Sequence, residues 1–308
     1  MPAGELRIEE KGFGMQKRVF RVGCLPLRAA LVGTLRAVVL FAALLTATIV
    51  QADDFGLWGN VDITQDIGQT PLSVDLGLGM RANNNVGSLS RWNINVGLDY
   101  TPMKWLKIGA GYNMIRSYSL SSRSEKISMA EDGTTTWKGY NMDHSYWRNK
   151  DRFYVDVRGK LKIGRFGLAL RERYQATIFE GVWVTEDKYR YNTEYDLDGQ
   201  ATYVLRDGYP TSELEEKSHK TKHALRSRLS LDYNIPKCPL TPEASFEVSN
   251  DLRDGFSTEK RRYSVGLDWK IKKRIHLIGT YIYSNGDDSD DDSNLHAIEL
   301  TLSLKNPF

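Results

Sequence analysis

The last strand-like segment of the chain, HAIELTLSLKNPF over residues 296–308, alternates between apolar and polar side chains. Over residues 296–305 one set of positions holds His, Ile and Leu, and the intervening set holds Ala, Glu, Thr, Ser and Lys, before Asn306 and Pro307 break the alternation. A period of two predicts a β-strand with one apolar face and one polar face. Because the pattern returns along most of the sequence, the fold must offer every strand an apolar environment on one side and a polar environment on the other.

The alternation predicts about eleven strands after residue 56, most of them about ten residues long. This is the length that a tilted strand needs to cross a bilayer. Glu172 is an exception, because it falls on an apolar face. The expected strands cover residues 57–67, 72–81, 91–100, 106–114, 152–161, 165–178, 225–233, 243–248, 262–271, 275–283 and 296–305.

The connections between these strands differ in length. Short turns fall near residues 68, 102, 164, 237 and 272, and longer loops fall near residues 86, 134, 200, 255 and 289. Residues 117–150 and 179–222 are the longest of these loops. Such asymmetry is typical of a transmembrane barrel with short periplasmic turns and long extracellular loops. A soluble sandwich or lipocalin-like barrel also has alternating strands but does not require the asymmetry.

Aromatic residues lie near both sets of strand ends, and we interpret them as two girdles at the membrane interfaces. Tyr100, Trp105, Tyr233, Trp269 and Phe308 are near the short turns, and Trp58, Trp92 and Tyr118 are near the long loops. The strand number remains open between ten and twelve. Since closed single-chain bacterial barrels have even numbers of strands, either the first strand lies inside or beside a ten-strand barrel, or a long loop contains a twelfth.

The beginning of the chain has the order of a secretory signal peptide. Basic residues precede an apolar run from Ala37 to Val50, and the small-residue motif Val50-Gln51-Ala52 predicts cleavage between Ala52 and Asp53. We therefore expect a signal peptide over residues 1–52, with Met15 as an alternative start, and a barrel over residues 53–308. An uncleaved single-pass anchor is the alternative, but the run is shorter than a spanning helix.

Charge and cysteine content exclude several classes of protein. The formal charge of the whole chain is +3, but residues 53–308 hold 35 basic and 36 acidic side chains, a net charge of −1. The net positive charge of the chain therefore comes from the leader and does not indicate a nucleic-acid partner. Cys24 lies in the leader, so Cys238 is the one cysteine left after cleavage, which excludes a disulfide framework or a cysteine zinc site.

Charged residues concentrate on the polar faces of the strands, which would line the lumen of a barrel. We interpret them first as a network of ion pairs and hydrogen bonds that fills a narrow barrel. The alternative is a selective pathway or pocket for a small anion, since arginine outnumbers acid. The residues are Arg152, Asp156, Arg158, Lys160, Arg171, Arg173, Arg226, Arg228, Glu243, Glu247, Arg262 and Asp268.

No motif predicts catalysis, a cofactor or a metal. Asp143-His144-Ser145 contains the residue types of an acyl-transfer enzyme, but residues adjacent in sequence seldom present a nucleophile and a base to each other. His219, His223, His276 and His296 have no partner at a diagnostic spacing. The aspartates of residues 287–292 lack the spacing of an EF-hand loop and read as a solvated acidic loop.

Two features resemble known proteins. A final strand that ends on Phe308 resembles the C-terminal insertion signal of bacterial outer-membrane barrels. The run RSRLSLDYNIPKCPLTPEASFEVSNDL, followed by KRRYSVGLDWKIKKRIHLIGTYIY, resembles a family of outer-membrane barrels of Gram-negative bacteria known only as a domain of unknown function. The resemblance extends more loosely from Trp58 to Phe308. It implies a fold and a location, and it implies no activity.

We therefore expect an all-β, antiparallel transmembrane β-barrel of 10 to 12 strands in the outer membrane of a Gram-negative bacterium. Its expected partners are outer-membrane lipid and, during insertion, the barrel-assembly machinery. We expect a non-enzymatic protein with a charge-filled lumen. A small-solute or anion channel, an outer-membrane lipid-modifying hydrolase and a secreted soluble β-barrel remain as alternatives.

Overall fold

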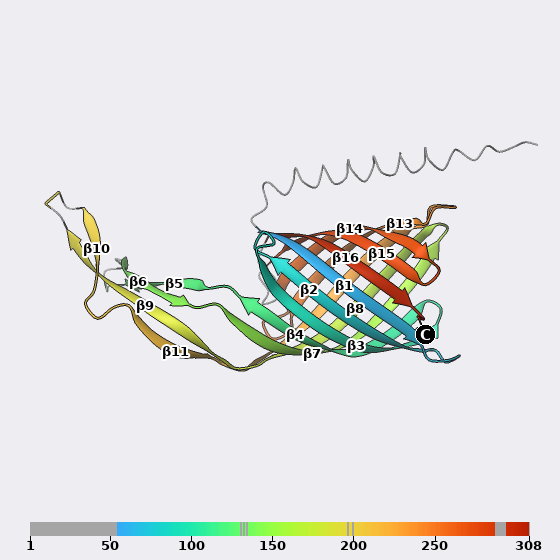
Figure 1. Ribbon diagram of the computed structural model, residues 1–308, viewed down its shortest axis with the longest axis horizontal. Helices are drawn as coiled ribbons and strands as arrows, with labels where there is room; N and C mark the ends of the chain where they lie inside the picture. The colour runs from blue at the N-terminus through green and yellow to red at the C-terminus, as the bar shows by residue number, and fades with distance from the viewer. Residues whose placement is uncertain are drawn as a thin grey trace, which may run out of the picture. The chain divides into compact units, whose positions relative to one another are not determined.

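The computed structural model describes residues 54–307, except 130, 132, 134, 196, 199 and 287–293. Within this part of the chain the regular elements are β-strands (Figure 1). They are β1 (Asp54–Asp66), β2 (Leu72–Asn83), β3 (Ser88–Met103), β4 (Leu106–Ser119), β5 (Ser122–Met129), β6 (Thr135–Asp143), β7 (Tyr146–Ile163), β8 (Phe166–Phe179), β9 (Val182–Tyr195), β10 (Ala201–Leu205), β11 (Thr211–Lys217), β12 (Lys220–Tyr233), β13 (Leu240–Asp251), β14 (Thr258–Lys272), β15 (Ile275–Asn285) and β16 (Leu295–Lys305). No helix in the described ranges is long and apolar enough to span a membrane.

Eleven strands form a closed barrel in the order β1-β16-β15-β14-β13-β12-β8-β7-β4-β3-β2 (Figure 1). The predicted range of ten to twelve strands is confirmed, but the expected even number is wrong. Every neighbouring pair is antiparallel except β1 and β16, which pair in parallel from Asp54↔Leu295 to Thr64↔Lys305. With an odd number of strands that alternate in direction, the first and last point the same way, so the barrel can close only through a parallel pair.

The two ends of the barrel carry different connections. One end, which we call the short-turn end, holds the connections 67–71, 104–105, 164–165, 234–239 and 273–274. The opposite end, the long-loop end, holds connections 84–87, 252–257 and 286–294 and the strands outside the barrel. The connections near residues 86 and 255 were predicted as longer loops, but neither is longer than the turn 234–239 at the opposite end. β1 begins at the long-loop end, where Val86 N donates to Phe55 O at 3.2 Å.

The apolar faces of the strands point outward. On β2, Leu76, Leu78 and Met80 are 46%, 56% and 57% exposed, whereas the intervening positions face the lumen. The luminal positions of the wall hold buried polar groups such as Asp156 and Glu247. The alternation in the sequence therefore predicted the orientation of the strands correctly, because adjacent side chains point to opposite faces of a sheet.

Trp58 does not belong to an interfacial girdle, and that prediction is wrong. Its side chain is 1% exposed and packs inside the barrel with Ile282, Leu295 and Ala297. The indole Nε1 donates to Asn83 Oδ1 at 3.0 Å. The physical reason is the alternation of β1, which turns Trp58 to the same side as the polar residues of that strand. In contrast, three aromatic residues near the short turns are exposed as a girdle requires: Tyr100, Trp105 and Trp269.

Much of residues 117–150 and 179–222 forms strands, although both ranges were predicted as loops. β5, β6, β9, β10 and β11 form a sheet outside the barrel, in the order β10-β9-β6-β5 with β11 also paired to β9. Aromatic rings pack on one face of this outer sheet. Tyr140 stacks on Tyr189 with ring centroids 4.5 Å apart, and Trp137 lies 4.9 Å from Tyr191. Cross-strand aromatic pairs of this kind stabilise antiparallel sheets.

Glu172 points outward from the middle of β8, as its place in the alternation predicts. Ser227 Oγ on the neighbouring strand β12 donates to Glu172 Oε2 at 2.6 Å. Several other predictions fall outside the described residues: the signal peptide, its cleavage site at Ala52 and Asp53, the aspartates of residues 287–292 and the terminal Phe308.

Candidate solute site in the barrel lumen

Glu247 of β13, a luminal carboxylate that is 3% exposed, lies among four arginines. Arg171 Nη2 of β8 and Arg228 Nε of β12 each lie 2.7 Å from Glu247 Oε2, and Arg226 Nε lies 3.1 Å from Glu247 Oε1. Arg262 Nη1 of β14 is 3.9 Å from the same carboxylate. The strand register produces this arrangement, because Arg171, Arg228, Glu247 and Arg262 are successive partners across β8, β12, β13 and β14. We call these five residues the Glu247 cluster.

A second ion-pair group lies on β7 and β8. Arg173 Nε donates to Asp156 Oδ2 at 2.9 Å, and Arg158 Nη2 lies 3.8 Å from Asp156 Oδ1. The Arg173 guanidinium also lies over the Tyr154 ring, 4.1 Å from its centroid. Asp156 is 2% exposed and Glu247 is 3% exposed, so both carboxylates have exchanged water for guanidinium partners.

The remaining residues predicted to line the lumen lie outside these two groups. Arg152 Nε donates to Thr177 Oγ1 at 2.9 Å, and Lys160 pairs with Asp232 at 3.2 Å near the short-turn end. Within the described residues Asp268 pairs with no arginine, and its Oδ1 lies 2.9 Å from His276 Nδ1. The twelve predicted residues are therefore spread along the wall and do not form one site.

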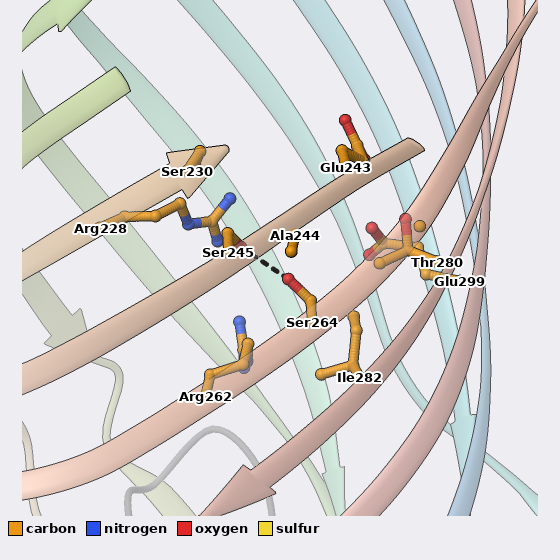
Figure 2. A pocket seen from close by; sticks show the side chains of 11 residues that line it. Arg228, Ser230, Glu243, Ala244, Ser245, Arg262, Ser264, Thr280, Ile282 and Glu299 are labelled. Carbon is orange, nitrogen blue, oxygen red and sulfur yellow. Dashed lines mark hydrogen bonds between the residues drawn. The ribbon is translucent and has the colours of Figure 1, made fainter. Parts of the chain in front are cut away.

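Glu243, the last of the twelve, lines a cavity of about 170 Å³ beside the Glu247 cluster. Figure 2 shows Arg228 and Arg262 on one side of this cavity and Glu243 and Glu299 on the other. The serine hydroxyls of Ser245 and Ser264 lie between them, 2.6 Å apart. Further lining residues are Ser230, Ala244, Gly266, Thr280 and Ile282.

Gly266 keeps part of the cavity wall open. A Cβ atom at this position would lie 2.9 Å from Thr280 Oγ1, 3.0 Å from Gly279 O and 3.1 Å from Glu243 Oε1. Gly279 O is a backbone atom of β15, so it cannot move away from such a Cβ atom without disturbing the ladder between β14 and β15. The absence of a side chain at Gly266 therefore lets the carboxylate of Glu243 and the hydroxyl of Thr280 approach the same space.

Sequence reasoning missed most of this cavity. Glu299, Thr280 and the serines are ordinary polar residues on alternating strands, and nothing in their local sequence distinguishes them. They meet because Thr280 is the register partner of both Gly266 and Glu299, across three adjacent strands. The signal available in the sequence was Glu299, a carboxylate on the polar face of the final strand.

The outer sheet contains a histidine contact, but not one suited to acyl transfer. His144 Nε2 lies 2.7 Å from Asp187 Oδ2, and Ser212 Oγ donates to Asp187 Oδ1 at 2.5 Å. These two hydrogen bonds, from Ser212 and from His144, hold the pKa of Asp187 below its ordinary value. In a catalytic triad the histidine stands between serine and aspartate. Here the aspartate stands between the other two, so the serine is not activated.

Three carboxylates of the outer sheet lie close together. Ligand oxygens of Asp143, Glu186 and Glu215 are within 4.8 Å of one another. Lys217 Nζ lies 3.0 Å from Asp143 Oδ2 and 3.1 Å from Glu215 Oε2, so a side-chain cation already neutralises part of this charge. Burial, followed by a hydrogen bond with Glu215, raises the pKa of Glu186 above its ordinary value.

Solved structures with some similarity to the chain include a porin and domains of two autotransporters. The NanC porin has 10% identity over 82% of this chain and 98% of its own, with a TM-score of 0.40. The beta domain of the Bordetella autotransporter Brka has 11% identity over 78% of this chain and 84% of its own, also with a TM-score of 0.40. The translocator domain of autotransporter NalP from Neisseria meningitidis has 13% identity over 82% and 92%, with a TM-score of 0.27.

No curated protein has significant similarity to the chain. One family model does match it, over residues 55–294, a range that extends from the second residue of β1 to the residue before β16. The chain belongs to the family described as Protein of unknown function (DUF2490).

Proposed function

We propose that this protein is an outer-membrane β-barrel of a Gram-negative bacterium whose narrow, charged lumen admits small polar solutes and performs no covalent chemistry. One observation carries the proposal. In a closed barrel, the apolar side chains face outward and the charged side chains face inward. In water this arrangement exposes an extended apolar surface, which soluble proteins avoid. In a bilayer the same surface is covered by hydrocarbon.

The orientation follows from the connections. Transmembrane barrels of this class place short turns in the periplasm and long loops outside the cell. The short-turn end would therefore face the periplasm, and the long-loop end with the outer sheet would face the exterior. Outer-membrane lipid is the proposed surrounding, and the barrel-assembly machinery is the proposed partner during insertion. Cleavage of the leader between Ala52 and Asp53 is part of the same proposal.

The lumen is proposed to be narrow because its central charges are packed. In a water-filled pore, charged side chains remain hydrated and exposed. Glu247 and Asp156 are nearly fully buried by their arginine partners, which come from several strands of the wall. The ion-pair network thus occupies space that a wide pore would leave to water. A solute would have to be small and polar to replace water beside these groups.

Gel migration and conductance test the proposal. The protein from a membrane fraction should run as a compact, fast band without boiling and as a slower band after boiling. In planar bilayers it should give much smaller currents than a water-filled pore. Extraction into the aqueous phase, or migration that boiling does not change, would contradict the barrel in the membrane.

A pair of double variants tests the constriction. Arg171→Ala with Glu247→Ala removes an ion pair from the centre of the lumen and should raise the conductance. The matched control, Arg123→Ala with Glu125→Ala, removes an exposed pair at 2.7 Å on the outer sheet and should leave it unchanged. Equal conductance in the two variants, with both barrels heat-modifiable, would mean that the Glu247 cluster does not limit passage.

A further inference from the structure

We propose that the luminal cavity beside the Glu247 cluster binds a small zwitterion, a solute with one anionic group and one ammonium group. The inference deepens the proposed function and rests on it, because the solute must reach the lumen of a membrane barrel. Its first support is the separation of charge. Arg228 and Arg262 border one side of the cavity, and Glu243 and Glu299 border the other (Figure 2).

The anionic group of the solute would lie against the two arginines. Arg228 is held in place because its Nε donates to Glu247 Oε2 at 2.7 Å. Arg262 is positioned by the same carboxylate, at 3.9 Å, and by Trp58, whose ring centroid lies 5.5 Å from the guanidinium carbon. Guanidinium groups fixed in this way lose little entropy on binding and recognise planar carboxylates well.

The ammonium group would lie against the two glutamates. Both glutamates are half-buried, and within the described residues neither forms an ion pair or a hydrogen bond. Two carboxylates that line one cavity without an ion-pair partner in contact repel each other and have lost part of their hydration. An ammonium carries three donors, which matches two carboxylates and the hydroxyl of Thr280, the register partner of Glu299.

The size of the cavity limits the solute. Pockets for drug-sized ligands have volumes of about 300 to 1,000 Å³, and this cavity has about 170 Å³. It therefore suits a molecule of amino-acid size and excludes disaccharides and nucleotides. Ile282 supplies an apolar part of the wall, against which a short methylene chain between the two charged groups can pack.

The mixture of charges argues against simpler ligands. A plain anion would be attracted by Arg228 but repelled by Glu243 and Glu299. A metal cation would be attracted by the glutamates but repelled by both guanidiniums. Only a ligand with both charges places each of its groups beside the opposite charge of the wall. The charge pattern therefore selects the zwitterion over either of the singly charged classes.

Three probes of equal chain length test this selection: 4-aminobutyrate, butyrate and butylammonium. Binding to the purified, full-length barrel in detergent is measured by ligand-observed nuclear magnetic resonance. We expect 4-aminobutyrate to bind at least about tenfold more tightly than either of the others, because each lacks one charge-assisted contact. Equal binding of butyrate would identify an anion site, and equal binding of butylammonium a cation site. Either result would overturn the proposal, as would binding of none of the three.

Variants locate the binding. Glu299→Gln and Glu243→Gln each keep the shape of the side chain and remove one carboxylate, and we expect each to weaken 4-aminobutyrate binding about tenfold. Glu172→Gln is the matched control, because it removes a carboxylate from the outer face of the barrel. If all three variants bind equally, the cavity is not the site. Boiling-dependent gel migration is checked for every sample. Absence of 4-aminobutyrate binding to a barrel that still gives the compact band would contradict the zwitterion site alone. Absence of the compact band in the parent protein would contradict the proposed function.

Discussion

Asp66 and Asn306, which are 240 residues apart in sequence, are joined by two hydrogen bonds across the seam of the barrel. The backbone N of Asp66 donates to Asn306 Oδ1 at 2.7 Å, and Asn306 Nδ2 donates to Asp66 Oδ2 at 2.8 Å. The backbone N of Asn306 also donates to Thr64 O at 2.7 Å. The last residues of the parallel pair β1 and β16 are thus fixed where the ladder ends, so this contact closes the barrel at its short-turn end.

Replacement of this asparagine should destabilise the barrel. Asn306→Ala removes both side-chain hydrogen bonds, and we expect a loss of about 1 to 3 kcal/mol in the free energy of unfolding. Asn306 has a φ of 49°, which asparagine tolerates better than alanine. Asn84→Ala is the matched control, since Asn84 has a φ of 54° and its side chain forms no hydrogen bond within the described residues. The measurement is the temperature at which the compact band disappears. Equal shifts for the two variants would assign the effect to backbone conformation alone.

The parallel seam also determines where β1 begins. Because β1 runs in the same direction as β16, Asp54 lies at the long-loop end and Lys305 lies at the short-turn end. If the long-loop end faces the exterior, an epitope tag inserted just before Asp54 should bind antibody on intact cells. A tag after Lys305 should bind antibody only after the outer membrane is permeabilised. The reverse pattern would contradict the proposed orientation, and labelling of both tags on intact cells would contradict the parallel pair.

The barrel strands could be predicted from the sequence because each has an apolar face and a polar face. Leu76 and Leu78 alternate with Gly77 and Gly79 in a way that only a two-sided strand explains. The strands of the outer sheet could not be predicted from the same alternation, because the residues that pack against each other there are amphipathic. Tyr140 and Tyr189 stack on each other, yet their hydroxyl groups and charged neighbours make the segments read as polar loops.

The candidate site was less predictable than the fold, for a geometric reason. The period of one strand tells which residues face the lumen, and it identified Arg228, Glu243 and Arg262 as luminal candidates. It does not tell which residues of neighbouring strands meet. The pairing of Thr280 with Glu299, and of Gly266 with Thr280, depends on turn lengths and strand register. The parallel pairing of β1 with β16 could not be predicted from either strand alone, because it depends on the number of strands in the whole barrel.

Glu247 should be the luminal carboxylate with the largest effect on stability. Glu247→Gln leaves four arginines around a neutral group, and removing one partner of a buried ion pair costs about 3 to 5 kcal/mol. Glu243→Gln is the control, because Glu243 is half-buried and its replacement leaves no arginine without its partner. The midpoint of urea unfolding, followed by the compact band, compares the two. Similar midpoints would show that the four arginines are hydrated, and would contradict the proposal that the ion-pair network fills the lumen.

Glu186 should make the stability of the outer sheet depend on pH. Burial and the neighbouring Glu215 raise its pKa above the ordinary value of 4.5, so the folded sheet holds this proton more tightly than the unfolded chain. Stability is therefore lost as pH rises above 4.5 and Glu186 ionises.

Glu186→Gln keeps the oxygen that accepts from Asn141 Nδ2 at 2.8 Å but cannot ionise. Hydrogen exchange of β6, β9 and β11 should be slower in this variant than in the parent at pH 7, with no difference near pH 3. Glu194→Gln, a change at an exposed position of β9, should match the parent at both values. A variant that exchanges faster than the parent at pH 7 would mean that ionised Glu186 stabilises the sheet, through Lys188 at 4.0 Å, more than its carboxylate neighbours destabilise it.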